Sequence, residues 1–214
     1  MQKTNAKCKK CRREGKKLFL KGERCFSAKC AIVKRNYPPG IHGTKARTKS
    51  KRGLSAYGQQ LREKQVAKKV YNLNEKQFAN YFKKAIRQKG DTGENLLQFL
   101  ELRLDNVIYR VGLVSSRKLA RQLVSHGYFQ VNGKNINIPS YNLKTNDKIT
   151  IKPAKINKKI LDNIKESIKE KKDNFSSWLN LDKDSFAITI LAKPNFKEVE
   201  RLFDIKMIVE FYSK

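Results

Sequence analysis

Four cysteines lie near the start of this chain, as a C-x2-C pair at Cys8 and Cys11 and a C-x4-C pair at Cys25 and Cys30. Two thiolates separated by two residues can face one ion from a tight turn, and the intervening loop can bring the second pair round to complete a tetrahedron. Four protein thiolates leave no coordination position open, so the spacing predicts a structural metal site. We expect Zn²⁺, with an iron–sulfur cluster as the alternative, because both take four cysteines.

Disulfide bonds are the other use of paired cysteines, and they are typical of oxidising compartments. The N-terminal sequence lacks the apolar region of a secretory signal peptide. No stretch approaches the ~18 apolar residues that a membrane span needs. We therefore expect a cytoplasmic protein in which the cysteines bind metal, and we expect the surrounding lysines and arginines to favour the thiolate form.

The positive charge of the chain is large and unevenly distributed. The formal net charge is +30 over 214 residues, and residues 1–52 hold 18 Lys and Arg against two glutamates, which is +16 of that total. Self-repulsion of this size is normally tolerated because a polyanion neutralises it in use. Nucleic acid is therefore the first expected partner, and an anionic membrane surface is the second.

Motifs for catalysis are not found. The sequence contains no G-x-x-x-x-G-K-[ST], G-x-G-x-x-G or G-x-S-x-G motif, and neither His42 nor His126 has a nearby carboxylate to orient it. For either histidine we expect a phosphate contact or a plain loop position. The chain is predicted not to be an enzyme.

The predicted secondary structure differs between the first 43 residues, the basic stretch that follows them and the helices beyond it. Residues 1–43 predict a metal-organised extension with little regular structure, ending in the turn-rich NYPPGIHG. The basic stretch 44–53 either stays disordered or orders on RNA. A charged helix capped by Ser55 follows, and then a helix whose apolar stripe runs from Phe78 to Ile86 as part of the core.

The third quarter predicts a small helix–helix–sheet unit. One helix is expected to open at Gly93 and Glu94, to carry a single apolar face from Leu96 to Val111 and to stop at Gly112. A shorter helix capped by Ser115 or Ser116 follows it. Beyond Gly127 the apolar period falls to two, and Asn132-Gly133 predicts a two-residue hairpin. Further on, residues 156–168 predict an amphipathic helix, and the runs 186–191 and 207–212 are strand-like.

Cationic and polar side chains recur on the outer face of this unit. Arg and Lys can contact phosphates, and Ser and Asn can contact the RNA sugar edge, so the surface would read shape more than sequence. The alternative is that these side chains are the solvated face of a small domain.

The runs LELRLDNVIYRVG, which ends at Gly112, and SSRKLARQLVSHGYFQVNGKNINIPSY, from Ser115 to Tyr141, resemble the RNA-binding module named after small-subunit ribosomal protein four. The segments CRREGKKLFLKGERC, NYPPGIHG, LSAYGQQLREKQ, TGENLL and VEFYSK resemble the family of that ribosomal protein itself. The four cysteines match the metal-binding branch of the family.

The resemblance implies an α+β fold with three parts. These are a metal-binding N-terminal extension over residues 1–43, a mainly helical domain with a basic arm over 44–95, and an inserted helix–helix–β RNA-binding module with its following helix over 96–174. Residues 175–214 are expected to complete the helical domain, so that the end of the chain packs beside residues 54–90.

The resemblance also implies a function. The chain would be a structural constituent of the small ribosomal subunit that binds 16S-type ribosomal RNA early in assembly and organises a multi-helix junction. It would contribute to translational accuracy and to the passage through which messenger RNA enters. The implied partners are 16S-type ribosomal RNA, messenger RNA, and small-subunit ribosomal proteins five and, in the decoding region, twelve, with no membrane.

The candidate RNA-binding residues all carry cationic or hydrogen-bonding side chains. They are Lys9, Lys10, Arg12, Arg13, Lys45, Arg47, Lys49, Arg62, Arg103, Asn106, Arg110, Arg117, Lys118, Arg121, Gln122, Ser125, His126, Asn132 and Lys134. The resemblance assigns Lys45, Arg47 and Lys49 to the messenger RNA passage.

Two other classes of protein remain as alternatives. RNA-modifying enzymes carry the same module, but beside a catalytic domain of ordinary size, and only about 60 residues follow the module here. A metal-dependent regulator that binds nucleic acid would prefer duplex DNA to structured RNA.

Overall fold

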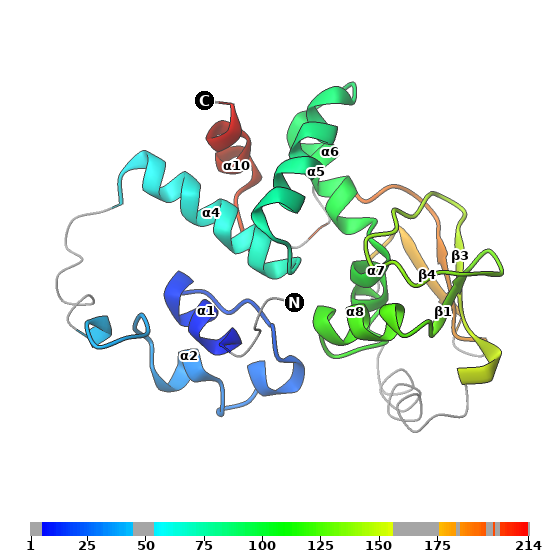
Figure 1. The fold of residues 1–214 in the computed structure, drawn as a ribbon, viewed down its shortest axis with the longest axis horizontal. Helices are drawn as coiled ribbons and strands as arrows, with labels where there is room; N and C mark the ends of the chain where they lie inside the picture. Colours follow the sequence, from blue (N-terminus) through cyan, green and yellow to red (C-terminus); the bar gives the residue numbers. More distant parts are fainter. Residues whose placement is uncertain are drawn as a thin grey trace. The chain divides into compact units, whose positions relative to one another are not determined.

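The computed structural model describes residues 6–44, 54–155, 176–182, 185–195, 199 and 202–213. The chain divides into two compact units, Met1–Ala79 with Arg201–Lys214, and Asn80–Glu200. The first unit is built from helices, and the second from an antiparallel sheet with helices packed against it (Figure 1). This mixture of helices and a small antiparallel sheet confirms the α+β part of the predicted fold class, and the metal-binding extension stays a prediction.

The described elements of the first unit are α1 (Lys7–Glu14), the 3-10 turn η1 (Gly22–Cys25), α2 (Ala31–Lys34), α4 (Ala56–Val70), the start of α5 (Glu75–Arg87) and α10 (Ile205–Tyr212). Those of the second unit are the end of α5, then α6 (Thr92–Glu101), α7 (Leu104–Arg110), α8 (Arg117–Ser125), β1 (Phe129–Val131), β2 (Lys134–Asn135), β3 (Lys148–Ile151), the 3-10 turn η2 (Pro153–Lys155), β4 (Leu179–Asp182) and β5 (Ala187–Ile190).

Short helices organise the N-terminal segment, where the sequence predicts little regular structure. Helix α1 carries Cys8 and Cys11 three residues apart, so the two thiols lie on one side of the helix. Cys11 is buried, as is Leu18 just beyond the helix. In the NYPPGIHG turn, a Cβ added to Gly43 would lie 1.9 Å from the carbonyl oxygen of Pro38, so only glycine fits there.

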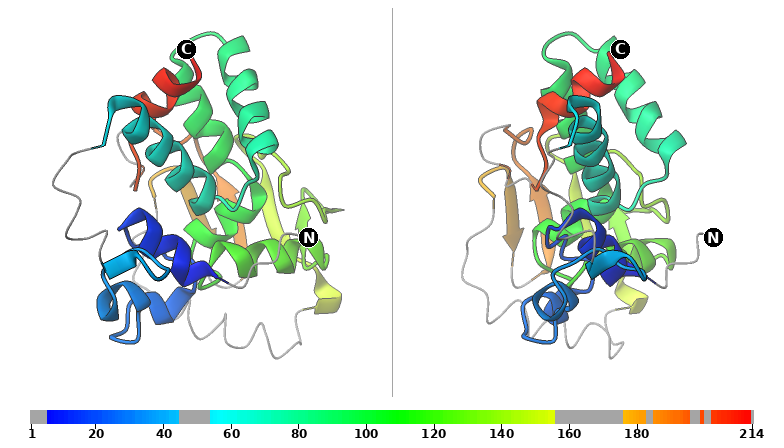
Figure 2. Two further views of the ribbon diagram at one scale, coloured as in Figure 1. Left: turned by 60° about the vertical axis from the view of Figure 1, so that its left-hand side comes forward. Right: turned by 90° about the vertical axis from the view of Figure 1, so that its left-hand side faces the viewer.

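Helices α4 and α10 lie side by side in the first unit (Figure 2). Ser55 caps α4 as predicted, because its hydroxyl accepts a hydrogen bond from the backbone N–H of Gly58 at 3.2 Å. The prediction of a strand-like run over residues 207–212 is wrong. The buried residues Ile205 and Ile208 are three positions apart, which is the spacing of one helical face.

Glu75 joins α4, α5 and α10 in the first unit. Its carboxylate accepts hydrogen bonds from Lys64 at 2.7 Å, Lys68 at 2.8 Å and the Tyr212 hydroxyl at 2.9 Å. The buried ammonium of Lys64 also lies 4.3 Å from the centroid of the Phe211 ring. The end of the chain is thus held to α4 by charge as well as by apolar contact.

The aromatic stripe of α5 is in the core, as predicted, but it is shorter than the sequence suggests. Phe78 and Phe82 are buried, whereas Ile86 is 56% exposed. Asn95 on α6 donates to the backbone carbonyl oxygens of Gln88 and Lys89 at 3.1 and 3.3 Å, which holds the end of α5 to α6.

The single helix predicted from Leu96 to Val111 is two helices. The chain breaks at Arg103, whose extended backbone (φ −69°, ψ 136°) separates α6 from α7. The backbone N–H of Leu104 donates to the Tyr141 carbonyl oxygen at 3.0 Å, and that of Leu143 donates to the Leu102 carbonyl oxygen at 2.9 Å. Pairing with a distant segment replaces the helical hydrogen bonds, and the apolar period of the sequence does not reveal it.

The described strands form one antiparallel sheet in the order β2-β1-β3-β5-β4. Asn132 and Gly133 form the predicted two-residue hairpin between Val131 and Lys134, with φ values of 50° and 76°. Positive φ at both central residues is the geometry that twists a hairpin correctly, and Asn-Gly adopts it readily. The predicted strand at residues 186–191 is confirmed as β5, whereas β4 was not predicted.

Helices α7 and α8 pack against this sheet through one apolar cluster (Figures 1 and 2). Its buried members include Leu104, Val107, Ile108, Leu123, Val124, Phe129, Ile149, Trp178, Ile188 and Ile190. The two helices therefore have one face in the core and one face left for other contacts.

Strands β4 and β5 lie in the second unit, although the predicted domain division assigns residues 175–214 to the helical domain. They join the sheet because β5 pairs with β3, Ile149 opposite Ile188. Only the last helix of that segment belongs to the first unit. The boundaries at residues 43, 95 and 174 stay a prediction, and the helix expected over 156–168 lies outside the described residues.

Candidate nucleic-acid interface

A buried carboxylate, Glu101, organises the polar side of α7. It ends α6, and its side chain is fully buried. Arg110 donates to both of its oxygens, from Nε at 2.9 Å and from Nη2 at 2.8 Å. Asn106 Nδ2 donates to the carboxylate at 2.8 Å and to the Glu101 backbone carbonyl oxygen at 2.9 Å. A bidentate pair of this kind fixes the guanidinium in position as well as neutralising it.

The same network extends to α8. The Oδ1 atom of Asn106 accepts a hydrogen bond from Arg117 Nε at 2.7 Å. The guanidinium of Arg117 also lies 4.3 Å from the centroid of the Tyr109 ring. Glu101 thus orients Arg117 through Asn106, and Tyr109 covers one face of the guanidinium.

A second buried acid, Asp105, has its own arginines. Arg103 donates to it from Nε at 3.0 Å and from Nη2 at 2.7 Å, and its Nη1 donates to the Tyr81 hydroxyl at 2.6 Å. Arg121 Nη1 lies 3.8 Å from the same carboxylate. Burial raises the pKa of Asp105, and the neighbouring arginines, Arg103 above all, oppose that rise.

Three of the expected RNA-binding side chains are held within the protein, and their contact with RNA stays a prediction. Arg103 and Asn106 are each only 1% exposed, and every side-chain hydrogen bond described above joins them to other protein groups. Arg110 is largely buried against Glu101, with a side chain 19% exposed. These three residues hold α6, α7 and α8 together through hydrogen bonds with Glu101, Asp105 and Arg117.

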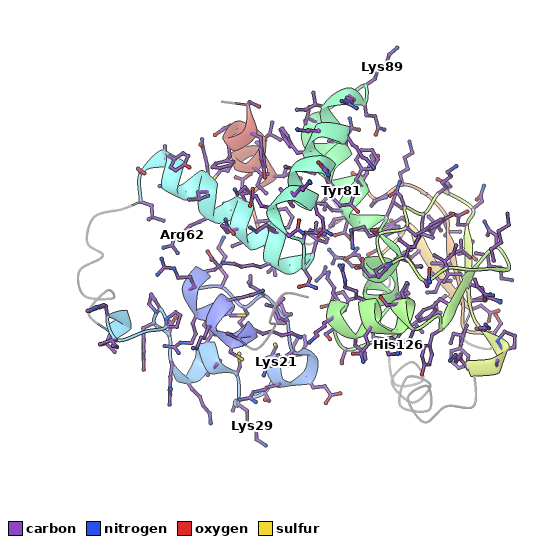
Figure 3. The ribbon with its side chains drawn as sticks, in the orientation of Figure 1. Lys21, Lys29, Arg62, Tyr81, Lys89 and His126 are labelled. Atoms are coloured by element: carbon purple, nitrogen blue, oxygen red, sulfur yellow. The ribbon has the colours of Figure 1, made fainter. Side chains whose placement is uncertain are left out.

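The exposed candidates gather on α8 and the hairpin. Lys118, Gln122, Ser125 and His126 are exposed on α8 and at its end, and Lys134 is exposed on β2. His126 is labelled beside α8 in Figure 3. Arg117 and Arg121 are half-buried, so each can present part of its guanidinium to a ligand.

The side chain of Asn132 links the hairpin to residues 147 and 148. Its Oδ1 accepts a hydrogen bond from the Lys148 backbone N–H at 2.8 Å, and its Nδ2 donates to Asp147 Oδ1 at 2.8 Å. The side chain is exposed. These bonds use one N–H and one lone pair of the amide, so the exposed side chain keeps a second N–H and a second lone pair for another partner.

The basic residues of the first unit differ in how far they are committed to other contacts. Lys9 and Arg13 are exposed and Lys10 is half-buried on α1. Arg12 donates to the Tyr37 and Pro38 carbonyl oxygens at 2.9 and 3.3 Å.

Arg62 points from α4 toward α1 (Figure 3), where it donates to the Arg13 carbonyl oxygen at 3.0 Å. It also lies 4.0 Å from a carboxylate oxygen of Glu14, which pairs with Lys69 as well. Lys45, Arg47 and Lys49 lie outside the described residues.

The four cysteines are free thiols, and three of them are buried. Burial raises the pKa of Cys11, a hydrogen bond with the Leu18 backbone lowers it, and the Cys25, Cys8 and Cys30 thiols raise it again. The donor set suits Zn²⁺, yet among the described residues no group of three or more His, Cys, Asp or Glu side chains is arranged to hold a metal ion.

Glu101 was not identified from the sequence as the acid that accepts hydrogen bonds from Asn106 and Arg110. A signal was present, because Glu101 is an acid set among leucines in the run LLQFLELRL, and an arginine follows at residue 110. An acid on an otherwise apolar helix is unlikely to be buried without a partner.

Among the described helices, none combines the length and apolarity that a membrane crossing needs.

Comparison with known families agrees with this arrangement. Residues 2–101 match the Ribosomal protein S4/S9 N-terminal domain, and residues 102–149 match the S4 domain. The two matches meet where α6 ends and the chain breaks before α7. The helix pair with its hairpin is thus an S4 domain.

Relatives match along almost the whole chain. The chain is 48% identical over 211 residues to small ribosomal subunit protein uS4A of Clostridium acetobutylicum, covering 99% of this chain and 98% of that protein. It is 47% identical over 212 residues to small ribosomal subunit protein uS4 of Thermotoga maritima, with the same coverage. The chain belongs to the uS4 family of small ribosomal subunit proteins.

Proposed function

We propose that this chain is a structural constituent of the small ribosomal subunit and binds ribosomal RNA, in the cytoplasm. The observation that carries the proposal is the identity of 47–48% with proteins of that name over 99% of the chain. The net charge of +30 supports a polyanionic partner. The relatives carry the name of a ribosomal protein, which is consistent with the prediction that the chain is not an enzyme.

The exposed side of α8 is the proposed RNA surface of the S4 domain. Lys118, Arg117 and Arg121 would contact phosphates, and Gln122, Ser125 and His126 would contact sugar or base edges. Lys134 extends the cationic surface onto the hairpin. The four arginines of the network exceed its two buried acids, Glu101 and Asp105, so the scaffold itself leaves a positive field behind this surface.

The finer role is proposed from the family resemblance. The RNA would be of 16S type, and the chain would bind it early in assembly at a multi-helix junction. Lys45, Arg47 and Lys49 would line the passage through which messenger RNA enters, and the protein would affect translational accuracy. Ribosomal proteins five and twelve would be its neighbours. The exposed Lys9 and Arg13 would add phosphate contacts from the N-terminal segment.

The N-terminal segment is proposed to hold one structural Zn²⁺ through Cys8, Cys11, Cys25 and Cys30, with an iron–sulfur cluster as the alternative. The C-x2-C and C-x4-C spacing supports this proposal, because thiolates so close along the chain can face one ion and the intervening loop can bring the two pairs together. A bound ion would supply folding free energy to a segment with few buried apolar side chains. Elemental analysis and absorption spectroscopy of protein purified without air decide the matter, and metal-free protein that is still folded contradicts it.

Binding of the whole chain to small-subunit ribosomal RNA tests the main proposal. Each neutralised phosphate releases counterions, so log K should fall with log salt at a slope of magnitude at least about 5. Arg121→Ala should weaken binding by roughly 1.5–3 kcal/mol if its contact is well formed. Lys83→Ala, an exposed lysine on α5, is the matched control and should bind like the parent. A slope near zero, or failure to sediment with small subunits after a high-salt wash, contradicts the proposal.

A further inference from the structure

Phe26 is a large aromatic side chain that the first unit leaves in solvent. It follows η1 directly and is 74% exposed. Its ring stacks on that of Phe19, with the centroids 5.1 Å apart and the planes 29° from parallel. One face of Phe26 is therefore supported, and the exposed area lies on the opposite face and the edges.

The backbone around this pair is held in place. Phe19 has a φ of 49°, in the left-handed region that bulky residues rarely adopt. Strain of this kind persists where the surroundings impose it, and it is found at binding sites. On the other side, the Phe26 N–H donates to the Glu23 carbonyl oxygen at 3.0 Å, and the Lys21 N–H donates to Cys25 Sγ at 3.3 Å. The backbone that carries the ring is thus held by these hydrogen bonds, and the ring itself is supported by its stacking on Phe19.

Three exposed cations lie close to Phe26 along the chain. Lys21, Arg24 and Lys29 are exposed within five residues of Phe26 along the chain, and Lys29 projects away from the ribbon in Figure 3. None of the three forms an ion pair with a carboxylate in the part of the chain that the structure describes. Glu23 is the one acid between residues 15 and 30.

We propose that Phe26 is a stacking platform for one unpaired base of RNA, and that Lys21, Arg24 and Lys29 contact the flanking phosphates. An aromatic face beside cations is the combination that binds single-stranded nucleic acid, because every base has a face to stack and every linkage carries a charge. The cations favour a polyanion over an apolar protein surface as the occupant. This inference rests on the proposed function and adds a base-stacking contact to the phosphate contacts proposed for the N-terminal segment.

The test compares variants of the full chain for affinity to small-subunit ribosomal RNA. Phe26→Ala should lower the affinity by about 5- to 140-fold, the range for loss of one stacked base. Phe26→Trp should retain it, whereas Phe26→Leu should lose as much as Phe26→Ala because leucine is apolar but has no ring. Val33→Ala, at another exposed apolar position of the same unit, should bind like the parent. The salt slope should stay unchanged in Phe26→Ala because no charge is removed.

The outcomes separate this inference from the proposed function. If the parent does not bind small-subunit ribosomal RNA, the proposed function fails. If the parent binds and Phe26→Ala binds equally well, the stacking site is overturned and the proposed function stands. Full binding by Phe26→Leu also overturns it and points to apolar docking of a protein. Ultraviolet crosslinking of the parent complex gives a check independent of the variants: a crosslink at Phe26 is expected, and crosslinks only elsewhere overturn the assignment.

Discussion

Two arginines of the S4 domain and two lysines of the N-terminal segment all lie in basic stretches of the sequence, but they differ in burial and in their partners. Arg103 and Arg110 are held by buried acids, each through two hydrogen bonds. Lys9 and Lys29 are exposed and have no ion pair among the described residues. The comparison teaches that a basic residue belongs to the scaffold where an acid is buried beside it, and is available to a ligand where none is.

The energetic consequences of the two arrangements differ in kind. Removing one partner of a buried pair leaves an uncompensated charge, whereas removing an exposed cation leaves stability almost unchanged. Variants of the buried pairs of Arg103 and Arg110 should therefore show first in unfolding, and variants of exposed cations such as Lys9 first in RNA binding.

The largest expected effect is that of Glu101→Ala. It removes the acceptor of Arg110 and one acceptor of Asn106, and it should cost about 3–5 kcal/mol of unfolding free energy. Urea denaturation measures this cost. Glu94→Ala is the matched control, since Glu94 is exposed in the first turn of the same helix and should cost about 0.3–1 kcal/mol. Equal costs for the two variants would remove the distinction between scaffold and surface charge.

Leu104→Ala tests the apolar layer beneath the arginines. Leu104 is fully buried between α7 and the sheet, and its truncation should cost about 2–5 kcal/mol by leaving a cavity. Leu119→Ala on the neighbouring helix α8 is the control and should cost less, because Leu119 is only half-buried. Thermal unfolding ranks the two. A larger loss at Leu119 would mean that α8 is the better packed of the two helices.

Glu75→Gln extends the comparison to a charge cluster in the first unit that is partly exposed. Burial raises the pKa of Glu75, but hydrogen bonds from Lys64, Lys68 and Tyr212 lower it more, and the pKa falls from 4.5 to about 2. The folded-state pKa lies below the unfolded one, so the stabilisation is complete above 4.5 and is lost as the pH falls toward 2.

Because the Glu75 side chain is 48% exposed, solvent screening reduces this stabilisation to about 1 kcal/mol. Denaturation of the parent and Glu75→Gln should differ by that amount near neutral pH and converge in acid. A difference that does not depend on pH would assign the effect to packing instead.

Lys9→Ala should have the smallest effect on stability, within about 0.5 kcal/mol. If Lys9 contacts a phosphate, the variant should lower the magnitude of the salt slope of RNA binding by about 0.9. The exposed Lys83 on α5 again supplies the control, with no change expected in either measurement. If Lys9→Ala unfolds the protein, Lys9 is needed for stability, and exposure does not distinguish the two kinds of basic residue.

Much of the secondary structure could be predicted because its signals are local. Ser55 and Ser116 cap their helices through their own hydroxyls, and Asn132-Gly133 adopts positive φ at little cost. The break at Arg103 and the helix at α10 could not be predicted in this way. The break at Arg103 depends on backbone pairing with Tyr141 and Leu143, which are about 40 residues away along the chain. Helix α10 depends on the burial of Ile205 and Ile208, which is set by the elements packed against them and not by the neighbouring sequence.

The sequence by itself determined the class of this protein and its polyanionic partner. Charge, cysteine spacing and the S4 motifs are properties of composition and order, and they do not depend on where the side chains point. Tertiary structure alone decided which basic residues are paired with buried acids and which are exposed. Whether an arginine meets an acid such as Glu101 or Asp105 depends on how α6, α7 and α8 pack, and burial then makes that pairing obligatory because an unpaired charge is costly away from water.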